Sequence, residues 1–158
     1  MDPRISTGFL GTEASFASDV ALLAYILLIV PGMIGGFILA RRSNYFYHQL
    51  LMTSIVIINW VIIAYLMVYS YNLTIAPKIP ERLGQVGYLL PTVHLITGLA
   101  AQLLGTNLVL QFWLGPLWPL RLEPYKRWMY ATLVLWLITA ALGIIYYLIT
   151  YVDALMIR

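Results

Sequence analysis

Cysteine is missing from all 158 residues of this chain. Without a thiol the chain forms no disulfide, no thiolate-held metal site, no iron–sulfur cluster and no thioether bond to haem. Histidine is scarce as well, with only two in the sequence. The lack of cysteine excludes these kinds of site, but it does not indicate the compartment in which the protein works.

Charged residues make up only 9% of the chain, whereas hydrophobic residues make up 62%. Soluble domains contain about 25% charged residues, so this composition indicates an integral membrane protein. The length allows about four apolar spans of ~20 residues with short connections, and it leaves no room for a sizeable soluble domain. The net charge of +3 is small and scattered, so no nucleic-acid partner is expected.

The apolar stretches predict a single all-α membrane domain over residues 1–158, a polytopic protein with transmembrane helices in an antiparallel bundle. After a tail of residues 1–19, we expect four helices, at residues 20–40, 46–71, 86–113 and 128–152. Ser18 or Asp19 is expected to cap the first of them. We expect this helix to be retained rather than cleaved as a signal peptide, because acidic residues precede it and Arg41 and Arg42 follow it.

Asp, Glu, Lys and Arg are absent from the central parts of the predicted spans. Proton pumps and ion-coupled transporters need such groups inside the membrane, which disfavours a small transporter. The sequence also lacks a Ser/His/Asp arrangement, a nucleophile elbow, an HExxH motif and a phosphate-binding glycine loop. We therefore expect no catalytic residues and no autonomous enzyme.

The third predicted helix carries polar side chains within an apolar stretch. Small and polar residues fall on one of its faces at helical spacing: His94, Gly98, Gln102, Gly105 and Thr106. Polar groups are costly against lipid, so we expect this face to pack against other helices. The same packing role is predicted for Asn59 in the second helix and for the notch formed by Gly32 and Gly36 in the first, beside a kink at Pro31.

The two histidines are candidates for a metal or haem site. A haem held by both His48 and His94 is disfavoured, because at ~1.5 Å of rise per residue they lie roughly 24 Å apart in depth. His48 and Met52, one turn apart, offer copper(I) a nitrogen and a thioether, but two ligands are at best half a site. We predict no metal site and no cofactor of the chain's own, and we expect His48 to be an interfacial anchor.

His94 leaves two alternatives open. It could bond to a neighbouring helix, a contact worth roughly 0.6 to 2 kcal/mol in a membrane. It could instead hydrogen-bond the carbonyl of a quinone, with Tyr88 or a tryptophan as a flat wall, or hold haem. The first alternative makes His94 a packing residue. The second makes the chain a small quinone- or haem-binding membrane redox protein, in contact with quinone or lipid.

Basic residues close to helix ends suggest the orientation. They gather on one side of the predicted bundle: Arg41, Arg42, Arg121, Lys126 and Arg127. Cytoplasmic loops carry such residues, so both termini are predicted to lie on the outer side of the membrane. The connection before the fourth helix contains Trp118 between prolines, which is typical of a loop at the level of the lipid headgroups.

Three segments of the sequence resemble a known family. They are RSNYFYHQLLM at residues 42–52, LLPTVHLITGLA at residues 89–100 and LEPYKRWMYATLVLWLITAALGIIYYLI at residues 122–149. They are similar to the corresponding helices of a family of small four-helix bacterial membrane proteins of unassigned domain, which includes the CtaM-type assembly factor for haem-copper cytochrome oxidase. The resemblance covers residues 21–152.

The resemblance implies a non-catalytic accessory subunit or assembly factor of a respiratory or photosynthetic electron-transfer complex. Its partners would be other membrane subunits of that complex and membrane lipids. The chain departs from the family's pattern where further histidines are usual, because residues 69–71 read Tyr-Ser-Tyr and residues 125–126 read Tyr-Lys. A structural role in such a complex is therefore expected at least as strongly as a role in maturation.

Overall fold

The structure, a computed structural model, describes residues 8–82 and 84–152, and these fold as helices joined by turns. The helices are α1 (Phe16–Ala24), α2 (Val30–Arg41), α3 (Tyr45–Ile62), α4 (Val68–Thr74), α5 (Ile79–Arg82), α6 (Val86–Leu114) and α7 (Tyr125–Tyr147). Within the described residues they join into four continuous spans that are long and apolar enough to cross a membrane: Phe16–Arg41, Tyr45–Lys78, Val86–Leu117 and Tyr125–Val152. We number these spans one to four.

The first span begins earlier than the sequence analysis predicted. Its N-cap is Ser15, whose side chain accepts a hydrogen bond from the backbone N–H of Ser18 at 3.2 Å. Neither Ser18 nor Asp19 is the cap, and Asp19 lies in the first helical turn instead of in a tail. The expected tail of residues 1–19 was therefore wrong from Phe16 onward, and its residues 1–7 lie outside the described part of the chain.

The other spans also extend beyond their predicted limits. The second continues to Lys78 instead of ending at residue 71, the third ends in a 3-10 turn at Gly115–Leu117, and the fourth begins at Tyr125 directly after Pro124. Polar and basic residues at these ends lower the local hydropathy without breaking the helix. Hydropathy therefore gives the apolar part of each span but underestimates its helical length.

π-helical turns interrupt the α-helical hydrogen bonding, and the first of them, Tyr25–Ile29, directly precedes the turn that holds Pro31. Proline has no N–H to donate to the carbonyl four residues earlier, and its ring crowds that carbonyl, so the turn before it widens. The kink at Pro31 stays a prediction, and the structure places this widened turn directly before it. By contrast, α6 runs through Pro91 without a break.

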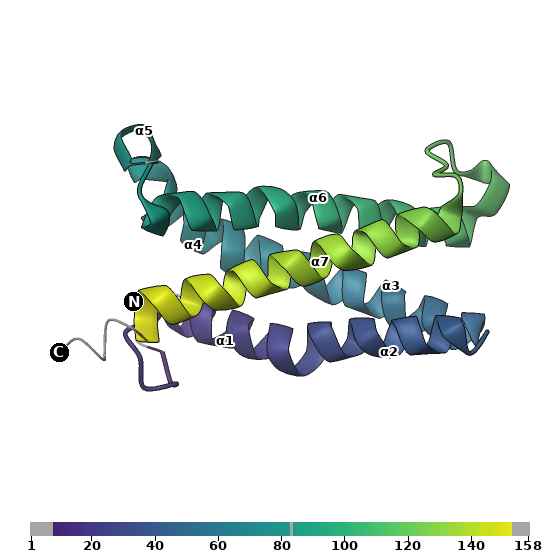
Figure 1. The fold of residues 1–158 in the computed structure, drawn as a ribbon, viewed down its shortest axis with the longest axis horizontal. Coiled ribbons are helices and arrows are strands. Elements are labelled where there is room, and N and C mark those ends of the chain that lie inside the picture. Colours follow the sequence, from purple (N-terminus) through teal and green to yellow (C-terminus); the bar gives the residue numbers. More distant parts are fainter. Residues whose placement is uncertain (1–7, 83, 153–158) are drawn as a thin grey trace.

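The four spans lie along the long axis of the molecule (Figure 1). α6 packs against α7 and α3, and α2 packs against α3. The turn after α2 and the loop before α7 lie at one end of the molecule, whereas α5 and the start of α1 lie at the other (Figure 1). His48 at the start of α3 and His94 near the start of α6 therefore belong to opposite ends.

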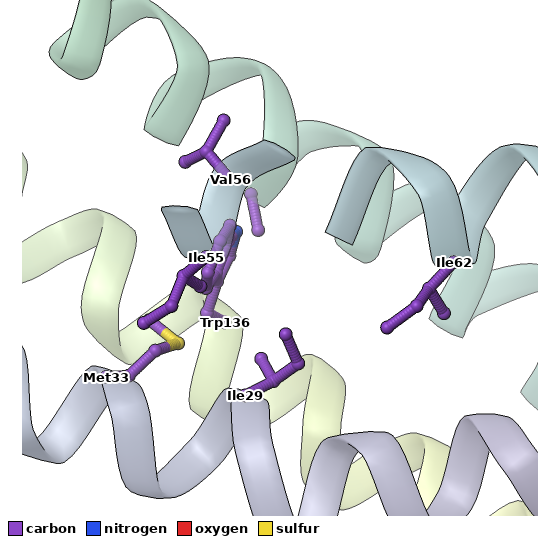
Figure 2. Close-up of a cluster of buried hydrophobic side chains, with 7 residues drawn as sticks. Ile29, Met33, Ile55, Val56, Ile62 and Trp136 are labelled. Atoms are coloured by element: carbon purple, nitrogen blue, oxygen red, sulfur yellow. The ribbon is translucent and has the colours of Figure 1, made fainter. Parts of the chain in front are cut away.

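Buried hydrophobic side chains form a cluster where all four spans meet: Ile29, Met33, Ile55, Val56, Ile62, Ala101 and Trp136. Figure 2 shows Ile29 and Met33 reaching from the first span towards Ile55 and Trp136. Gly105 lies beside the same tryptophan, and a Cβ on it would be 3.3 Å from Cζ2 of Trp136. The close approach of the third and fourth spans thus depends on a small residue at this point.

The glycine notch of the first span supports a direct test. A Cβ on Gly32 would lie 2.7 Å from Cδ1 of Ile55, which is buried, whereas a Cβ on Gly35 would lie 3.7 Å from Leu51, an ordinary contact. Gly32→Ala is therefore expected to lower the free energy of unfolding by about 1–3 kcal/mol through overpacking. Gly35→Ala is expected to raise it by up to about 1 kcal/mol, because alanine is the better helix former.

Reversible unfolding of both variants in mixed micelles measures the difference. Both glycines lie within α2, so the gain in helix propensity from alanine should be similar at the two positions and only the contact differs. Equal stability of the two variants would contradict the close packing of the first span on the second at Gly32.

Candidate functional site

A polar network links the first three spans near their middle. The Nδ2 group of Asn59 donates to Oε1 of Gln102 at 2.8 Å, and Nε2 of Gln102 donates to the carbonyl oxygen of Val56 at 2.9 Å. The hydroxyl of Tyr25 donates to Oδ1 of Asn59 at 2.7 Å. Gln102 and Asn59 are buried, with 0% and 3% of their surface exposed. The structure thus joins two residues that were predicted separately as packing residues.

The remaining residues of the polar face of α6 also contact other helices. Thr106 accepts a hydrogen bond from Nε1 of Trp60 at 2.9 Å. A Cβ on Gly98 would lie 3.1 Å from Cγ2 of Thr139. Together with Gln102, these contacts direct the face towards the second and fourth spans. Ile96 on the same helix points outward, with 63% of its surface exposed.

His48 binds the neighbouring helix. Its Nδ1 donates to the carbonyl oxygen of Gly36 at 2.7 Å, and a Cβ on Gly36 would lie 2.6 Å from Sδ of Met52. His48, Met52 and Gly36 are therefore neighbours, at the end of the molecule away from His94. In the part of the chain that the structure describes, no group of three or more His, Cys, Asp or Glu side chains is placed to hold a metal ion.

A cavity of about 360 Å³ opens between the four spans near the start of α6. Most of its lining is aliphatic, and the aromatic part includes Tyr25, Tyr71 and Tyr146, with His94 as the imidazole. Tyr88, which the sequence suggested as a wall beside His94, is not part of the lining. Sequence analysis did not find this cavity, because it requires the relative positions of all four spans.

The hydrogen bond of His94 fixes which ring nitrogen carries the proton. Its Nδ1 lies 2.9 Å from the carbonyl oxygen of Thr139, and a carbonyl only accepts, so Nδ1 is the donor. In the neutral ring Nε2 is then an acceptor. A quinone carbonyl needs a donor, so the interaction predicted from the sequence, between His94 and a quinone carbonyl, does not fit this tautomer.

Gly143 makes room for the imidazole. A Cβ at this position would lie 2.8 Å from Cε1 of His94 and 3.3 Å from its Nδ1. Any larger residue would therefore force the imidazole of His94 to shift. Gly143 lies on the fourth span and the imidazole on the third, so this contact could not be predicted from the sequence.

Asp19 is a residue whose importance the sequence analysis missed. It is fully buried, and its Oδ2 accepts hydrogen bonds from the backbone N–H groups of Phe9 and Leu10 at 2.7 and 2.9 Å. Its Oδ1 accepts from the hydroxyl of Tyr147 at 2.6 Å. The carboxylate therefore fastens the segment before α1 to the end of the fourth span. A first-turn acid after a serine N-cap was the available signal, but it indicates only the helix start.

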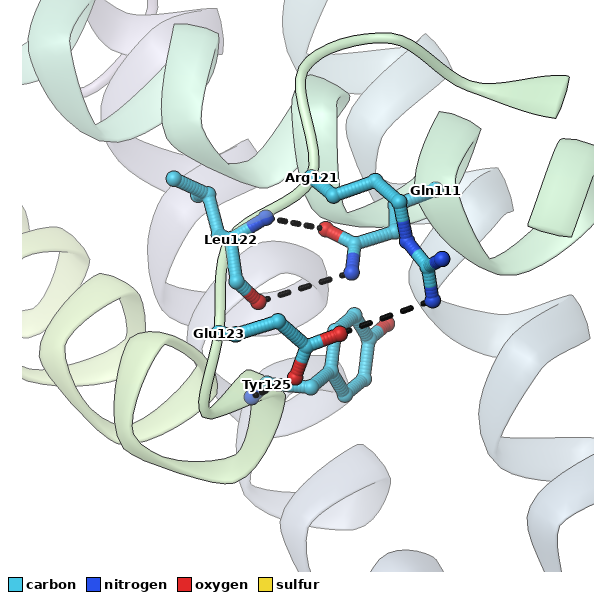
Figure 3. A network of polar contacts seen from close by, with 5 residues as sticks. All are labelled: Gln111, Arg121, Leu122, Glu123 and Tyr125. Carbon is cyan, nitrogen blue, oxygen red and sulfur yellow. Dashed lines mark hydrogen bonds and ion pairs between the residues drawn. The ribbon is translucent and has the colours of Figure 1, made fainter. Parts of the chain in front are cut away.

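The loop between α6 and α7 folds back onto α6. Gln111 accepts from the N–H of Leu122 at 2.9 Å through Oε1, and its Nε2 lies 3.4 Å from the carbonyl of the same residue (Figure 3). One turn earlier, Asn107 accepts from Nε1 of Trp118 at 2.7 Å and donates to the carbonyl of Leu120. The loop is thus held in a defined shape by polar residues at the end of the helix.

Comparisons with models of protein families, with curated proteins and with solved structures find no match to this chain. The resemblance to the four-helix family stays a prediction from the three quoted segments. The function of the chain is therefore inferred from its own contacts, exposed surfaces and cavity.

Proposed function

We propose that the chain is a non-catalytic accessory subunit or assembly factor of a respiratory or photosynthetic electron-transfer complex, and that it acts by helix–helix packing. In this proposal its spans form an antiparallel bundle in a bacterial inner membrane, with both termini on the outer side. The observation that supports the proposal is where the polar side chains of the spans lie and what they bond to. Polar side chains within the spans, such as Asn59 and Gln102, bond to the chain's own helices.

The outward surface of the spans is apolar. Large hydrophobic side chains are exposed on each of them, among them Leu27 (70%), Ile57 (59%), Ile96 (63%) and Val134 (55%). Such a surface is compatible with lipid or with the apolar helices of another membrane subunit, and not with water. This favours a protein that works through packing in the membrane.

The loop between α6 and α7 carries the large hydrophobic side chain with the highest exposed fraction among the described residues. Leu117 and Leu120 have 86% and 65% of their surface exposed, on a loop that Asn107 and Gln111 hold in shape. A rigid apolar projection suits contact with a partner subunit, because little conformational entropy is lost on binding. We therefore assign partner contact to this loop within the proposal.

Purification of the tagged chain from its native membrane in mild detergent tests the proposal. Recovery in a stoichiometric complex with subunits of an electron-transfer enzyme favours an accessory subunit, and recovery only with precursor forms of such an enzyme favours an assembly factor. Recovery of the chain without any partner in every detergent tested would contradict both the accessory-subunit role and the assembly-factor role.

Leu117→Ser is expected to lower the recovery of partner subunits several-fold while leaving the melting temperature of the isolated chain unchanged. The reason is that Leu117 is exposed in the isolated chain, so only the complex loses apolar contact. Arg121→Ala is the control: Arg121 pairs with Glu123 at 3.6 Å with both side chains more than half exposed, and such pairs contribute little. Equal recovery from the two variants would count against the assignment to the loop.

A further inference from the structure

The cavity beside His94 carries an inference that does not depend on the accessory role. Its volume of about 360 Å³ lies in the range of ligand pockets, roughly 300–1,000 Å³, which are mostly apolar with a few placed polar groups. It lies near the lower end of that range, which suits a single ring or two fused rings better than a porphyrin. The cavity is therefore large enough for the ring of a lipid-soluble molecule.

Several hydroxyl groups of the cavity's tyrosines are already engaged. The hydroxyl of Tyr25 donates to Asn59, that of Tyr147 donates to Asp19, and that of Tyr71 pairs with Thr92 at 3.0 Å. Their rings, by contrast, remain part of the cavity wall. Flat aromatic walls favour a flat apolar ring as the ligand.

Among the polar side chains that line the cavity, His94 offers an acceptor, its Nε2. Because Nδ1 donates to the Thr139 carbonyl, Nε2 of the neutral ring has a lone pair and no proton. A ligand that offers an O–H group satisfies this acceptor, whereas a ligand that offers a carbonyl leaves two acceptors facing each other. Leaving a buried polar group unpaired disfavours binding strongly.

We propose that the cavity binds the ring of a lipid-soluble hydroquinone, with one hydroxyl of the ring donating to Nε2 of His94. The oxidised quinone has only carbonyl groups at the same positions, so the site discriminates between the two forms. The site holds the hydroquinone as a bound ligand, and no redox step is assigned to it.

Calorimetric titration of the purified chain in detergent under argon tests this proposal. The ligands are decylubiquinol, decylubiquinone and decanol, which has the hydroxyl and the alkyl chain but lacks the ring. Decylubiquinol is expected to bind about tenfold more tightly than decylubiquinone, the effect of roughly one hydrogen bond. Equal affinity for the two forms, or equal affinity for decanol, would overturn the proposal.

The two histidines provide a matched pair of variants. Both donate Nδ1 to a backbone carbonyl of a neighbouring helix, but His94 lines the cavity and His48 does not. His94→Phe keeps a flat ring and removes the acceptor, so the preference for decylubiquinol should disappear. His48→Phe loses the equivalent helix contact and should keep the preference. The reverse pattern would overturn the assignment to His94.

Nitrogen NMR tests the same hydrogen bond without replacing His94, so its result does not depend on whether His94→Phe folds. In His48→Phe the imidazole of His94 is the sole histidine signal in the nitrogen NMR spectrum. Decylubiquinol should shift the signal of its unprotonated nitrogen, and decylubiquinone should leave that signal in place. A spectrum that decylubiquinol leaves unchanged would exclude the hydrogen bond to Nε2, while the accessory role would be unaffected.

Discussion

Gln102→Leu is expected to lower the free energy of unfolding by roughly 2–4 kcal/mol, because it removes two hydrogen bonds and leaves a buried donor unpaired. Nε2 of Gln102 no longer donates to Val56, and Nδ2 of Asn59, a residue only 3% exposed, loses its acceptor. Unfolding with sodium dodecyl sulfate in mixed micelles measures this loss.

A control on the same helix separates this effect from a general loss of polarity. Gln111→Leu removes contacts to the loop residue Leu122 and none between spans, so it should affect the loop's resistance to protease more than global stability. The double variant Asn59→Leu and Gln102→Leu should lose less free energy of unfolding than the two single variants added together, because neither amide is left without its partner. Strict additivity would contradict direct coupling of Asn59 and Gln102.

Asp19→Ala has the second large expected effect, a loss of roughly 2–4 kcal/mol. The substitution leaves the N–H groups of Phe9 and Leu10 without their acceptor and removes the bond from the hydroxyl of Tyr147, which keeps its contact with Thr12 at 2.9 Å. It should also make the segment before α1 sensitive to protease, because the carboxylate fastens that segment to the end of the fourth span. Unfolding in mixed micelles and limited proteolysis together measure these changes.

Tyr147→Phe is the matched control for Asp19. It keeps the ring in place and removes the hydroxyl, which donates to Oδ1 of Asp19 and also contacts Oγ1 of Thr12 at 2.9 Å, with a cost of about 1–2 kcal/mol. The backbone bonds of Phe9 and Leu10 to Oδ2 remain in this variant. If Asp19→Ala were no more destabilising than Tyr147→Phe, the carboxylate would not be the main connection between the N-terminal segment and the helices.

Sequence analysis was most successful where the signal is local. Long apolar stretches mark four spans in the chain because a helix that crosses lipid needs a continuous apolar surface. The predicted helix ends were less accurate. Ser15 caps the first span by accepting from the N–H of Ser18, but several nearby serines and aspartates have side chains that can do the same, so the sequence did not identify the cap. The widened turn before Pro31 was not predicted, although proline marked this part of the helix as irregular.

Contacts between spans were only partly predictable. The periodicity of α6 identified Gln102 and Gly98 as inward-facing, but not their partners Asn59 and Thr139, which lie far away in the sequence. The donor role of Nδ1 in His94 depends on the Thr139 carbonyl, so the acceptor role of Nε2 could not be inferred from the sequence. The role of Asp19 was missed because its contacts with Phe9, Leu10 and Tyr147 follow no helical spacing in the sequence.

Disulfide formation in intact membranes tests the central claim, that the small and polar face of α6 packs against the chain's own helices. A Cβ on Gly98 would lie 3.1 Å from Cγ2 of Thr139, close enough for a disulfide, and the chain has no native cysteine to interfere. The double variant Gly98→Cys and Thr139→Cys should cross-link on mild oxidation, whereas Ile96→Cys with Thr139→Cys should not, because Ile96 faces outward. Cross-linking of the second pair without the first would contradict the account.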